Sequence, residues 1–398
     1  MKRVIALCLL CILCISFSVH AEDSMIPELS IYRMPVPESP AMAYLQSMGV
    51  GWNLGNTFDA FRDQGLTDEL SLEGYWCGVK TTEAVFQSLK AEGFQTVRIP
   101  VSWHNHVSGE DFTISPAWLD RVQTVVDWAL QCDLHVILNT HHDVDYAYYY
   151  PSSDYLDGSL HYMESIWSQL AERFQDYDDR LIFESMNEPR LKDTDHEWYF
   201  DPKDASCLDA AACINALNQR FVDTVRKSGG NNSDRYLMVP AYDAAPENAC
   251  QDSFVLPSDT ADNRLIVSVH AYTPYAFALD AGGTDTFSHT FISQAQQIPL
   301  FMNKLYRRYI QNNIPVVIGE FGARNKNGNL TSRVDFAAYY AACASARNMP
   351  CLWWDNHAFH GNGELFGMLD RKTATFVYPQ IAEAMLTYGG YDKLSPAP

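Results

Sequence analysis

Short apolar runs alternate with longer amphipathic segments eight times along the chain. The apolar runs predict strands at residues 49–55, 96–103, 135–141, 181–187, 236–242, 265–272, 315–321 and 351–355. Apolar positions with helical spacing predict helices at residues 82–92, 118–131, 162–175, 210–227, 294–311 and 333–346. This repetition of strand and helix predicts parallel strands joined by crossover helices.

Eight such units predict an α/β fold of the TIM (β/α)₈ barrel type, whose usual size covers this chain of 398 residues. The fifth unit is the weakest, because residues 244–263 show little helical periodicity. No linker rich in Ser, Gly or Pro divides the sequence. We therefore expect a single catalytic domain at residues 46–392, preceded by a lead-in at residues 22–45.

The first 21 residues have the pattern of a secretory signal peptide. Lys2 and Arg3 precede an apolar run that ends at Val19, and Ala21 is a small residue suited to the cleavage position. The run is too short for a bilayer span, and no later segment approaches about 18 uninterrupted apolar residues. We expect a secreted protein, extracellular or periplasmic, with no membrane span.

The charge of the mature chain argues against nucleic acid as a partner. Removing the 21-residue signal leaves 377 residues and takes the net charge from −21 to −23, because Lys2 and Arg3 leave with it. Nucleic-acid binding needs a basic surface, whereas an acidic one is typical of a well-solvated protein. We expect a monomer.

Seven cysteines remain after removal of the signal, and an odd number leaves at least one without a partner in the chain. Their spacings match no zinc motif. Export would permit disulfides. Cys207 with Cys213, or Cys343 with Cys351, are candidate pairs.

Two glutamates carry the candidate chemistry. Glu188 lies in the string Ser185-Met186-Asn187-Glu188-Pro189 and Glu320 in Ile318-Gly319-Glu320-Phe321-Gly322, each at the end of an apolar run. Active sites of TIM barrels lie at the carboxyl ends of the strands. Two carboxylates at that edge fit cleavage of a glycosidic bond, one as proton donor and the other as nucleophile or base.

Other polar and aromatic side chains fall at the same strand ends. They are Arg98, His141, His142, Asn187, His270, Tyr272, Trp353 and Trp354, to which we add Asn56 after the first strand. We expect this set to bind substrate. Tyr146 to Tyr150 and Trp198, in the loops that follow, could line a groove for sugar rings.

The sequence resembles glycoside hydrolase family five over nearly the whole mature chain. The strings that carry the resemblance, in the order of the family, are Gly51-Trp52-Asn53-Leu54-Gly55-Asn56, Thr96-Val97-Arg98-Ile99-Pro100, Asn139-Thr140-His141-His142, Met186-Asn187-Glu188-Pro189, His270-Ala271-Tyr272, Gly319-Glu320-Phe321-Gly322 and Trp353-Trp354-Asp355-Asn356. Within the family, the segment Lys80-Thr81-Thr82 leading to Gly93-Phe94 and the Trp-Trp-Asp-Asn string are similar to bacterial endo-β-1,4-glucanases that include xyloglucan and mixed-linkage glucan hydrolases. The chain departs from them at Trp76-Cys77-Gly78-Val79, where Trp-Gly-Asn-Pro is usual.

The resemblance implies a secreted, retaining endo-β-1,4-glucanase acting on β-linked glucan. Glu188 would be the acid and then the base, with a pKa raised by the nearby charge of Glu320. Glu320 would be the nucleophile, held ionised by Arg98 and Tyr272. Asn187 would bind the sugar 2-hydroxyl, while one of His141 and His142, and one of Trp353 and Trp354, would face the sugar. The carboxyl groups should lie about 5 to 5.5 Å apart, as retention requires.

Several alternatives stay open at this point. A β-mannanase or a dedicated xyloglucanase would share the catalytic pair, and a sugar-binding barrel could have lost catalysis. His141, His142 and Asp143 would be suitable zinc ligands, but neighbouring strand residues point to opposite faces and would converge poorly on one ion. We therefore expect no metal and no cofactor.

Overall fold

The computed structural model describes residues 25–62 and 68–398, and the predicted signal peptide lies outside them. Eight parallel strands form a closed barrel in the order β1-β10-β9-β8-β7-β6-β5-β2. They are β1 (Val50–Leu54), β2 (Thr96–Ile99), β5 (His135–Asn139), β6 (Leu181–Glu184), β7 (Leu237–Pro240), β8 (Leu265–His270), β9 (Val316–Phe321) and β10 (Cys351–Asp355). The predicted TIM barrel is confirmed, with each strand inside or matching its predicted range.

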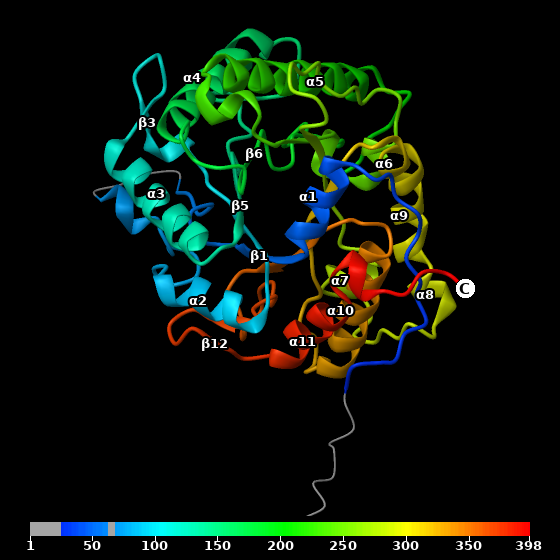
Figure 1. The fold of residues 1–398 in the computed structure, drawn as a ribbon. Coiled ribbons are helices and arrows are strands. Elements are labelled where there is room, and N and C mark those ends of the chain that lie inside the picture. The colour runs from blue at the N-terminus through cyan, green and yellow to red at the C-terminus, as the bar shows by residue number, and fades with distance from the viewer. Residues whose placement is uncertain (1–24, 63–67) are drawn as a thin grey trace, which may run out of the picture.

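Helices surround the barrel (Figure 1). They are α2 (Glu83–Glu92), α3 (Pro116–Gln131), α4 (Leu156–Arg173), α5 (Ala205–Lys227), α6 (Pro246–Ala249), α7 (Tyr275–Ala278), α8 (Ile292–Ala295), α9 (Gln297–Arg308), α10 (Leu330–Ser345) and α11 (Pro379–Tyr388). The weak periodicity of the fifth unit is matched by the four-residue α6. Two short hairpins, β3 (Val107–Ser108) with β4 (Thr113–Ile114) and β11 (Leu369–Asp370) with β12 (Thr375–Phe376), lie outside the barrel.

Several helix boundaries differ from the prediction, and α4 begins six residues before its expected start at residue 162. Helix α5 begins five residues early because the Asp204 carboxylate accepts the N–H groups of Ser206 and Cys207, a side-chain cap that apolar spacing does not reveal. The predicted helix at 294–311 is divided into α8 and α9.

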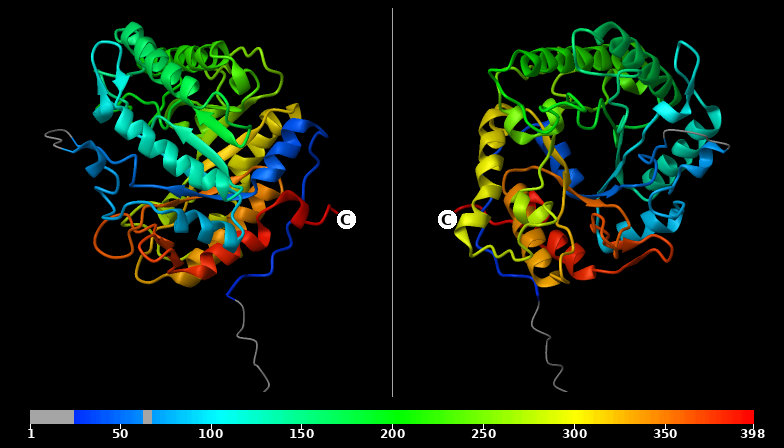
Figure 2. Two further views of the ribbon diagram at one scale, coloured as in Figure 1. Left: turned by 60° about the vertical axis from the view of Figure 1, so that its left-hand side comes forward. Right: turned by 180° about the vertical axis from the view of Figure 1, so that it is seen from behind.

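The lead-in is part of the domain. Helix α1 (Pro40–Met48) crosses the predicted boundary at residue 46 and lies across the amino-terminal end of the barrel, where Leu45 and Met48 are buried. Ahead of it, the Arg33 N–H donates to the carbonyl oxygen of Ser395 at 2.9 Å. Segments close to the two ends of the described chain therefore lie side by side on one side of the barrel (Figure 2).

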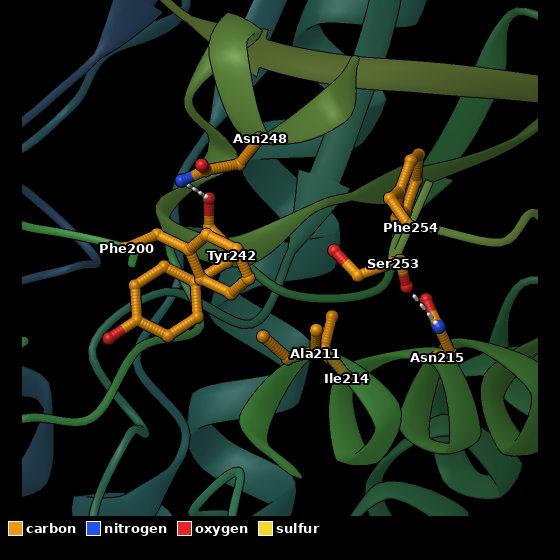
Figure 3. A pocket seen from close by; sticks show the side chains of 8 residues that line it. All are labelled: Phe200, Ala211, Ile214, Asn215, Tyr242, Asn248, Ser253 and Phe254. Carbon is orange, nitrogen blue, oxygen red and sulfur yellow. Dashed lines mark hydrogen bonds between the residues drawn. The ribbon is translucent and has the colours of Figure 1, made fainter. Parts of the chain in front are cut away.

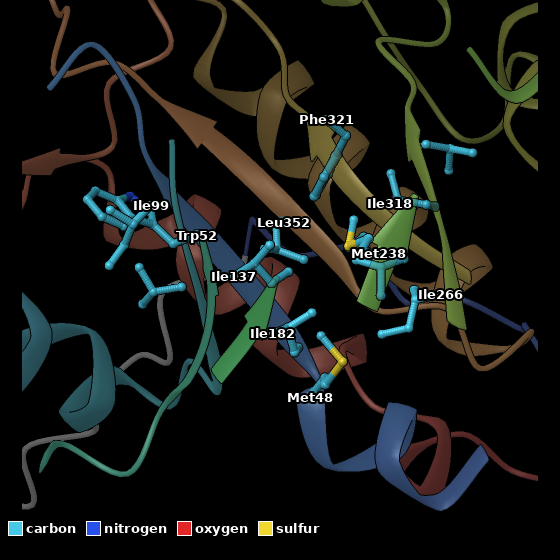
Figure 4. Packing of buried hydrophobic residues seen from close by; sticks show 14 of the residues in the cluster. Met48, Trp52, Ile99, Ile137, Ile182, Met238, Ile266, Ile318, Phe321 and Leu352 are labelled. Carbon is cyan, nitrogen blue, oxygen red and sulfur yellow. The ribbon is translucent and has the colours of Figure 1, made fainter. Parts of the chain in front are cut away.

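Most side chains of the barrel strands are apolar and buried. Figure 4 shows part of its buried cluster, which includes Trp52, Ile99, Ile137, Ile182, Met238, Ile266, Ile318 and Leu352. Strands of a parallel barrel are covered on both faces, so their sequences read as continuous apolar runs, as observed here. Against this background, the polar residues within the strands identify the site.

All seven described cysteines are free thiols, so neither candidate disulfide forms. Cys207 and Cys213 lie six positions apart on α5, a spacing that turns them to different sides of the helix. Across residues 25–62 and 68–398, no helix combines the length and apolarity needed to cross a bilayer.

Candidate active site

Glu188 and Glu320 meet at the carboxyl ends of the strands. One carboxylate oxygen of each, and one ring nitrogen of His270, all lie within 4.8 Å of one another. His270 Nδ1 is 2.8 Å from Glu188 Oε1 and 3.7 Å from Glu320 Oε1. Inverting enzymes separate their carboxyl groups by about 6.5 to 9.5 Å to admit a water molecule, whereas retaining enzymes hold them about 5 to 5.5 Å apart. The short approach seen here fits retention.

A register shift between β8 and β9 brings His270 beside the nucleophile. Val269 pairs with Ile318, but the next residue, His270, pairs with Glu320 and skips Gly319. The irregularity re-aims one side chain within an otherwise regular ladder, as β-bulges near active sites do. His270 thereby contacts both carboxylates.

Two donors hold the Glu320 carboxylate. Arg98 Nη1 donates to Oε1 at 2.7 Å, and the Tyr272 hydroxyl donates to Oε2 at 2.9 Å. Both expected partners of the nucleophile are therefore in contact with it. Such charge-assisted bonds are short and fix the carboxylate in orientation as well as in charge.

Arg98 does not line the substrate cavity, which corrects our expectation that it binds substrate. It is fully buried, and besides Glu320 it donates through Nε to Glu184 at 2.7 Å and through Nη2 to Asn187 Oδ1 at 2.8 Å. Its role is to position these three side chains. Because Asn187 Oδ1 accepts from Arg98, its amide N–H groups remain available for a sugar hydroxyl.

Glu184 is a site residue that we did not predict. Its carboxylate accepts from Arg98, from Asn139 Nδ2 at 3.0 Å and from the Ser268 hydroxyl at 2.6 Å, so it is fully satisfied inside the barrel. Removing one partner of such a buried ion pair typically costs about 3–5 kcal/mol. The signal in the sequence was an acidic residue at the end of the apolar run 181–183.

The pKa of Glu188 is shifted in the direction opposite to our expectation. Burial alone raises it, but the hydrogen bond from His270, followed by the charges of His270 and Arg190, brings the pKa below its usual 4.5. Conversely, burial alone lowers the pKa of His270, whereas the charge of Glu320 and the bond to Glu188 raise it above 6.5. Glu188 and His270 therefore form a pair that shares one proton over the neutral range.

Replacing His270 by Gln is expected to move the alkaline limb of kcat/KM to lower pH. The acid is competent only while the pair holds its proton, so activity is present below the upper pKa of the pair and is lost as the pH rises through it. When two sites share their last proton, the pair binds that proton at least as tightly as either of the two sites would bind it alone. Without His270 it is therefore released earlier. A pH–rate profile measures the shift.

His142→Gln is the control for that profile. Burial and the charge of Arg190 lower the pKa of His142 to about 3, so it stays neutral throughout and its loss should leave the limb in place. An unchanged limb in His270→Gln would contradict the shared proton.

His141 and His142 both line the cavity. Asn139 Nδ2 donates to His141 Nδ1 at 3.1 Å, which leaves the ring proton of His141 on Nε2. Burial, followed by the charges of His142 and Arg98, lowers the pKa of His141 well below 6.5. Its neutral ring can therefore donate to a sugar oxygen through Nε2.

Asp143 does not join His141 and His142 in a group that could hold a zinc ion. Asp143 Oδ1 accepts the N–H groups of Trp103 and His104 at 2.9 and 3.1 Å, which turns it to the loop after β2. Asp59 lies near the two imidazoles instead, but its carboxylate oxygens accept the N–H groups of Asn56 and Thr57. These contacts give both carboxylates a structural role.

The two tryptophans of β10 point to opposite faces of the strand, as adjacent strand residues do. Trp354, 8% exposed, lines the cavity with its ring parallel to that of His141 at 5.7 Å. Gly55 leaves room for it, because a Cβ there would lie 2.7 Å from the Trp354 ring. Trp353 is fully buried, and its Nε1 donates to the carbonyl oxygen of Phe366. Trp354 is thus the surface on which a pyranose ring can stack, and Trp353 belongs to the barrel wall.

A cavity of about 750 Å³ opens over the two glutamates, a size typical of ligand sites. Besides the residues above, it is lined by Trp198, Asp243, Ala245, Pro246, Glu247, Ala271, Thr273, Tyr275, Leu279 and Glu364. Asn56 is not among them and occupies a left-handed turn after β1, so the structure does not support its predicted contact with substrate. Of the aromatic residues in the loops, Trp198 lines the cavity, whereas Tyr146 packs against Tyr150 and Tyr155.

These features define a TIM-barrel glycosidase with a close carboxylate pair. The family model for cellulase, glycosyl hydrolase family 5, matches residues 58–360, and the chain belongs to this family. Endoglucanase B of Ruminococcus albus is 40% identical over 365 residues, which cover 91% of this chain and 84% of that protein.

Solved structures agree with this assignment. A variant of the family 5 lichenase from Caldicellulosiruptor sp. F32, in complex with cellotetraose, is 53% identical with a TM-score of 0.90, covering 91% of this chain and 99% of that one. A broad-specificity endoglucanase from Ruminococcus champanellensis with bound cellotriose is 41% identical with a TM-score of 0.82, covering 89% and 100%.

Proposed function

We propose that the chain is a retaining endo-β-1,4-glucanase that hydrolyses β-glucans by double displacement. The observation that carries this proposal is the grouping of Glu188, His270 and Glu320 within 4.8 Å at the floor of the cavity. Relatives that are named endoglucanases, and the lichenase and endoglucanase structures with bound cello-oligosaccharides, support β-glucans over β-mannan as substrates. The presence of both glutamates with their partners argues against an inactive sugar-binding barrel.

In the first step, Glu320 attacks the anomeric carbon while Glu188 protonates the departing glycosidic oxygen. The bond to the leaving sugar breaks as an ester to Glu320 forms. Trp354 offers its ring to the apolar face of the sugar, and Asn187 offers its amide to a hydroxyl group. In the second step, Glu188 takes a proton from water, which attacks the same carbon, frees Glu320 and restores the starting configuration.

Proton NMR of early hydrolysis tests this function. With barley β-glucan or cellotetraose as substrate, we expect the β-anomer of the new reducing end to accumulate first, because two inversions restore the configuration. Mutarotation then produces the α-anomer. Initial appearance of the α-anomer would overturn double displacement, and cleavage of β-mannan in place of both glucans would overturn the substrate assignment.

We also propose that the protein is secreted and acts as a monomer. The supporting observation for secretion is the signal-peptide pattern of residues 1–21. Recovery of a mature chain beginning at Glu22 from outside the cytoplasm, with the mass of one chain by light scattering, would support both. A product that retains residues 1–21 inside the cell, or a stable dimer, would contradict them.

A further inference from the structure

Asp243 is a cavity residue that the double-displacement mechanism does not use. It lies in the loop after β7, and its backbone N–H donates to the carbonyl oxygen of Pro189 at 2.8 Å. Pro189 directly follows the acid Glu188. The bond therefore attaches the β7 loop to the segment that carries the proton donor.

The neighbouring Tyr242 anchors this loop (Figure 3). Its ring packs beside Phe200, Ala211 and Ile214, and its carbonyl oxygen accepts from Asn248 Nδ2 at 3.1 Å. Its hydroxyl donates to the carbonyl oxygen of His196 at 2.6 Å and accepts from the Leu191 N–H at 3.0 Å. These contacts hold Asp243 in the left-handed region, at a φ of 57°, where a residue other than glycine needs support from its surroundings.

The carboxyl group of Asp243 is not satisfied by the protein. Its Oδ1 is buried and has no hydrogen-bond partner among the described residues. Burial, followed by the charge of Glu188, raises the pKa of Asp243 to about 9, although Arg190 opposes the shift. At neutral pH it is thus a carboxylic acid, with an O–H that can donate. Buried polar groups in proteins nearly always have a partner, so an unpartnered one that lines a ligand cavity indicates that the ligand provides it.

The position of Asp243 assigns it to one side of the scissile bond. Glu188 protonates the oxygen of the departing sugar, so groups that lie around the segment following Glu188 are on the leaving-group side. Trp198, from the same segment, lines the cavity with 62% of its surface exposed, and the Arg190 guanidinium lies 4.1 Å from the centre of its ring. An exposed, oriented indole beside a polar group is the combination that a sugar ring needs.

We propose that Asp243 binds a hydroxyl group of the sugar unit on the leaving-group side of the scissile bond. This inference rests on the proposed function. It adds a residue that favours substrates whose leaving group is a sugar.

Two substrates separate this role from an effect on Glu188. Cellotetraose places a sugar on the leaving-group side, whereas phenyl β-cellobioside needs protonation by Glu188 but has no sugar hydroxyl there. We expect Asp243→Ala to lower kcat/KM for cellotetraose by about 10- to 100-fold, because a site built to bind a hydroxyl loses its partner. The loss on phenyl β-cellobioside should be much smaller.

Three further variants complete the test. Asp243→Asn keeps the shape and a donor, and should recover most of the activity on cellotetraose. Asp243→Gly accepts the left-handed backbone without strain, so it should reproduce the Ala result even if Ala destabilises the loop. Asp252→Asn, an exposed carboxylate of the same β7–β8 connection, is the matched control and should behave as wild type.

Equal losses on the two substrates, or no loss on cellotetraose, would overturn the inference and leave the glucanase assignment intact. A wild-type protein that cleaves neither substrate would overturn the proposed function, and the inference with it.

Discussion

Replacing Glu320 by Gln is expected to lower kcat by about 10,000-fold or more on every substrate, because the amide cannot form the glycosyl ester. The protein should stay folded. Arg98, which loses its ion pair with Glu320, keeps Glu184 as a counter-ion at 2.7 Å, so no buried cation is left alone. Initial rates on barley β-glucan and on an aryl cellobioside measure the effect, and circular dichroism checks the fold.

The exposed Glu383 of α11 provides a matched control, since Glu383→Gln makes the same chemical change far from the cavity. Wild-type enzyme treated with a 2-fluoro cellobioside should carry the sugar on the peptide that contains Glu320. More than about a hundredth of wild-type activity in Glu320→Gln would show that another group is the nucleophile.

Replacing Glu188 by Ala should lower kcat/KM for β-glucan by about 1,000-fold and for an aryl cellobioside with a good leaving group far less. Only a poor leaving group needs the proton. Because Glu188 also activates water in the second step, the glycosyl-enzyme should accumulate with the aryl substrate. Steady-state and burst kinetics on the two substrates measure the difference.

Azide provides the matching rescue experiment. A small anion can enter the space left by the carboxylate and attack the glycosyl-enzyme without a base, so it should restore turnover on the aryl substrate and release a β-glycosyl azide. Equal losses on both substrates without rescue would refute the assignment of Glu188 as acid and base.

Local sequence pattern determined the architecture of this protein and its catalytic pair. Apolar runs of strand length and helical periodicity depend on burial along a single element, so the eight strands and the main helices could be predicted within a few residues. Glu188 and Glu320 were predicted because each interrupts such a run at a strand end. The same alternation showed that one of Trp353 and Trp354 must face away from the sugar.

The tertiary structure alone decided the electrostatics of the site. Arg98 was expected to bind substrate, yet it is fully buried in the closed barrel. Its guanidinium is surrounded by Glu184, Asn187 and Glu320. The register shift between β8 and β9 places His270 opposite Glu320, and the bond between His270 and Glu188 reverses the expected direction of the pKa shift of the Glu188 carboxyl.

Asp243 had no signal in the sequence, because its position depends on a hydrogen bond to Pro189, 54 residues earlier in the chain. Periodicity depends on which residues of a segment are buried, so it can be recognised from the sequence of that segment alone. Charges and hydrogen bonds act across the distances between segments, and those distances exist only after the barrel has closed.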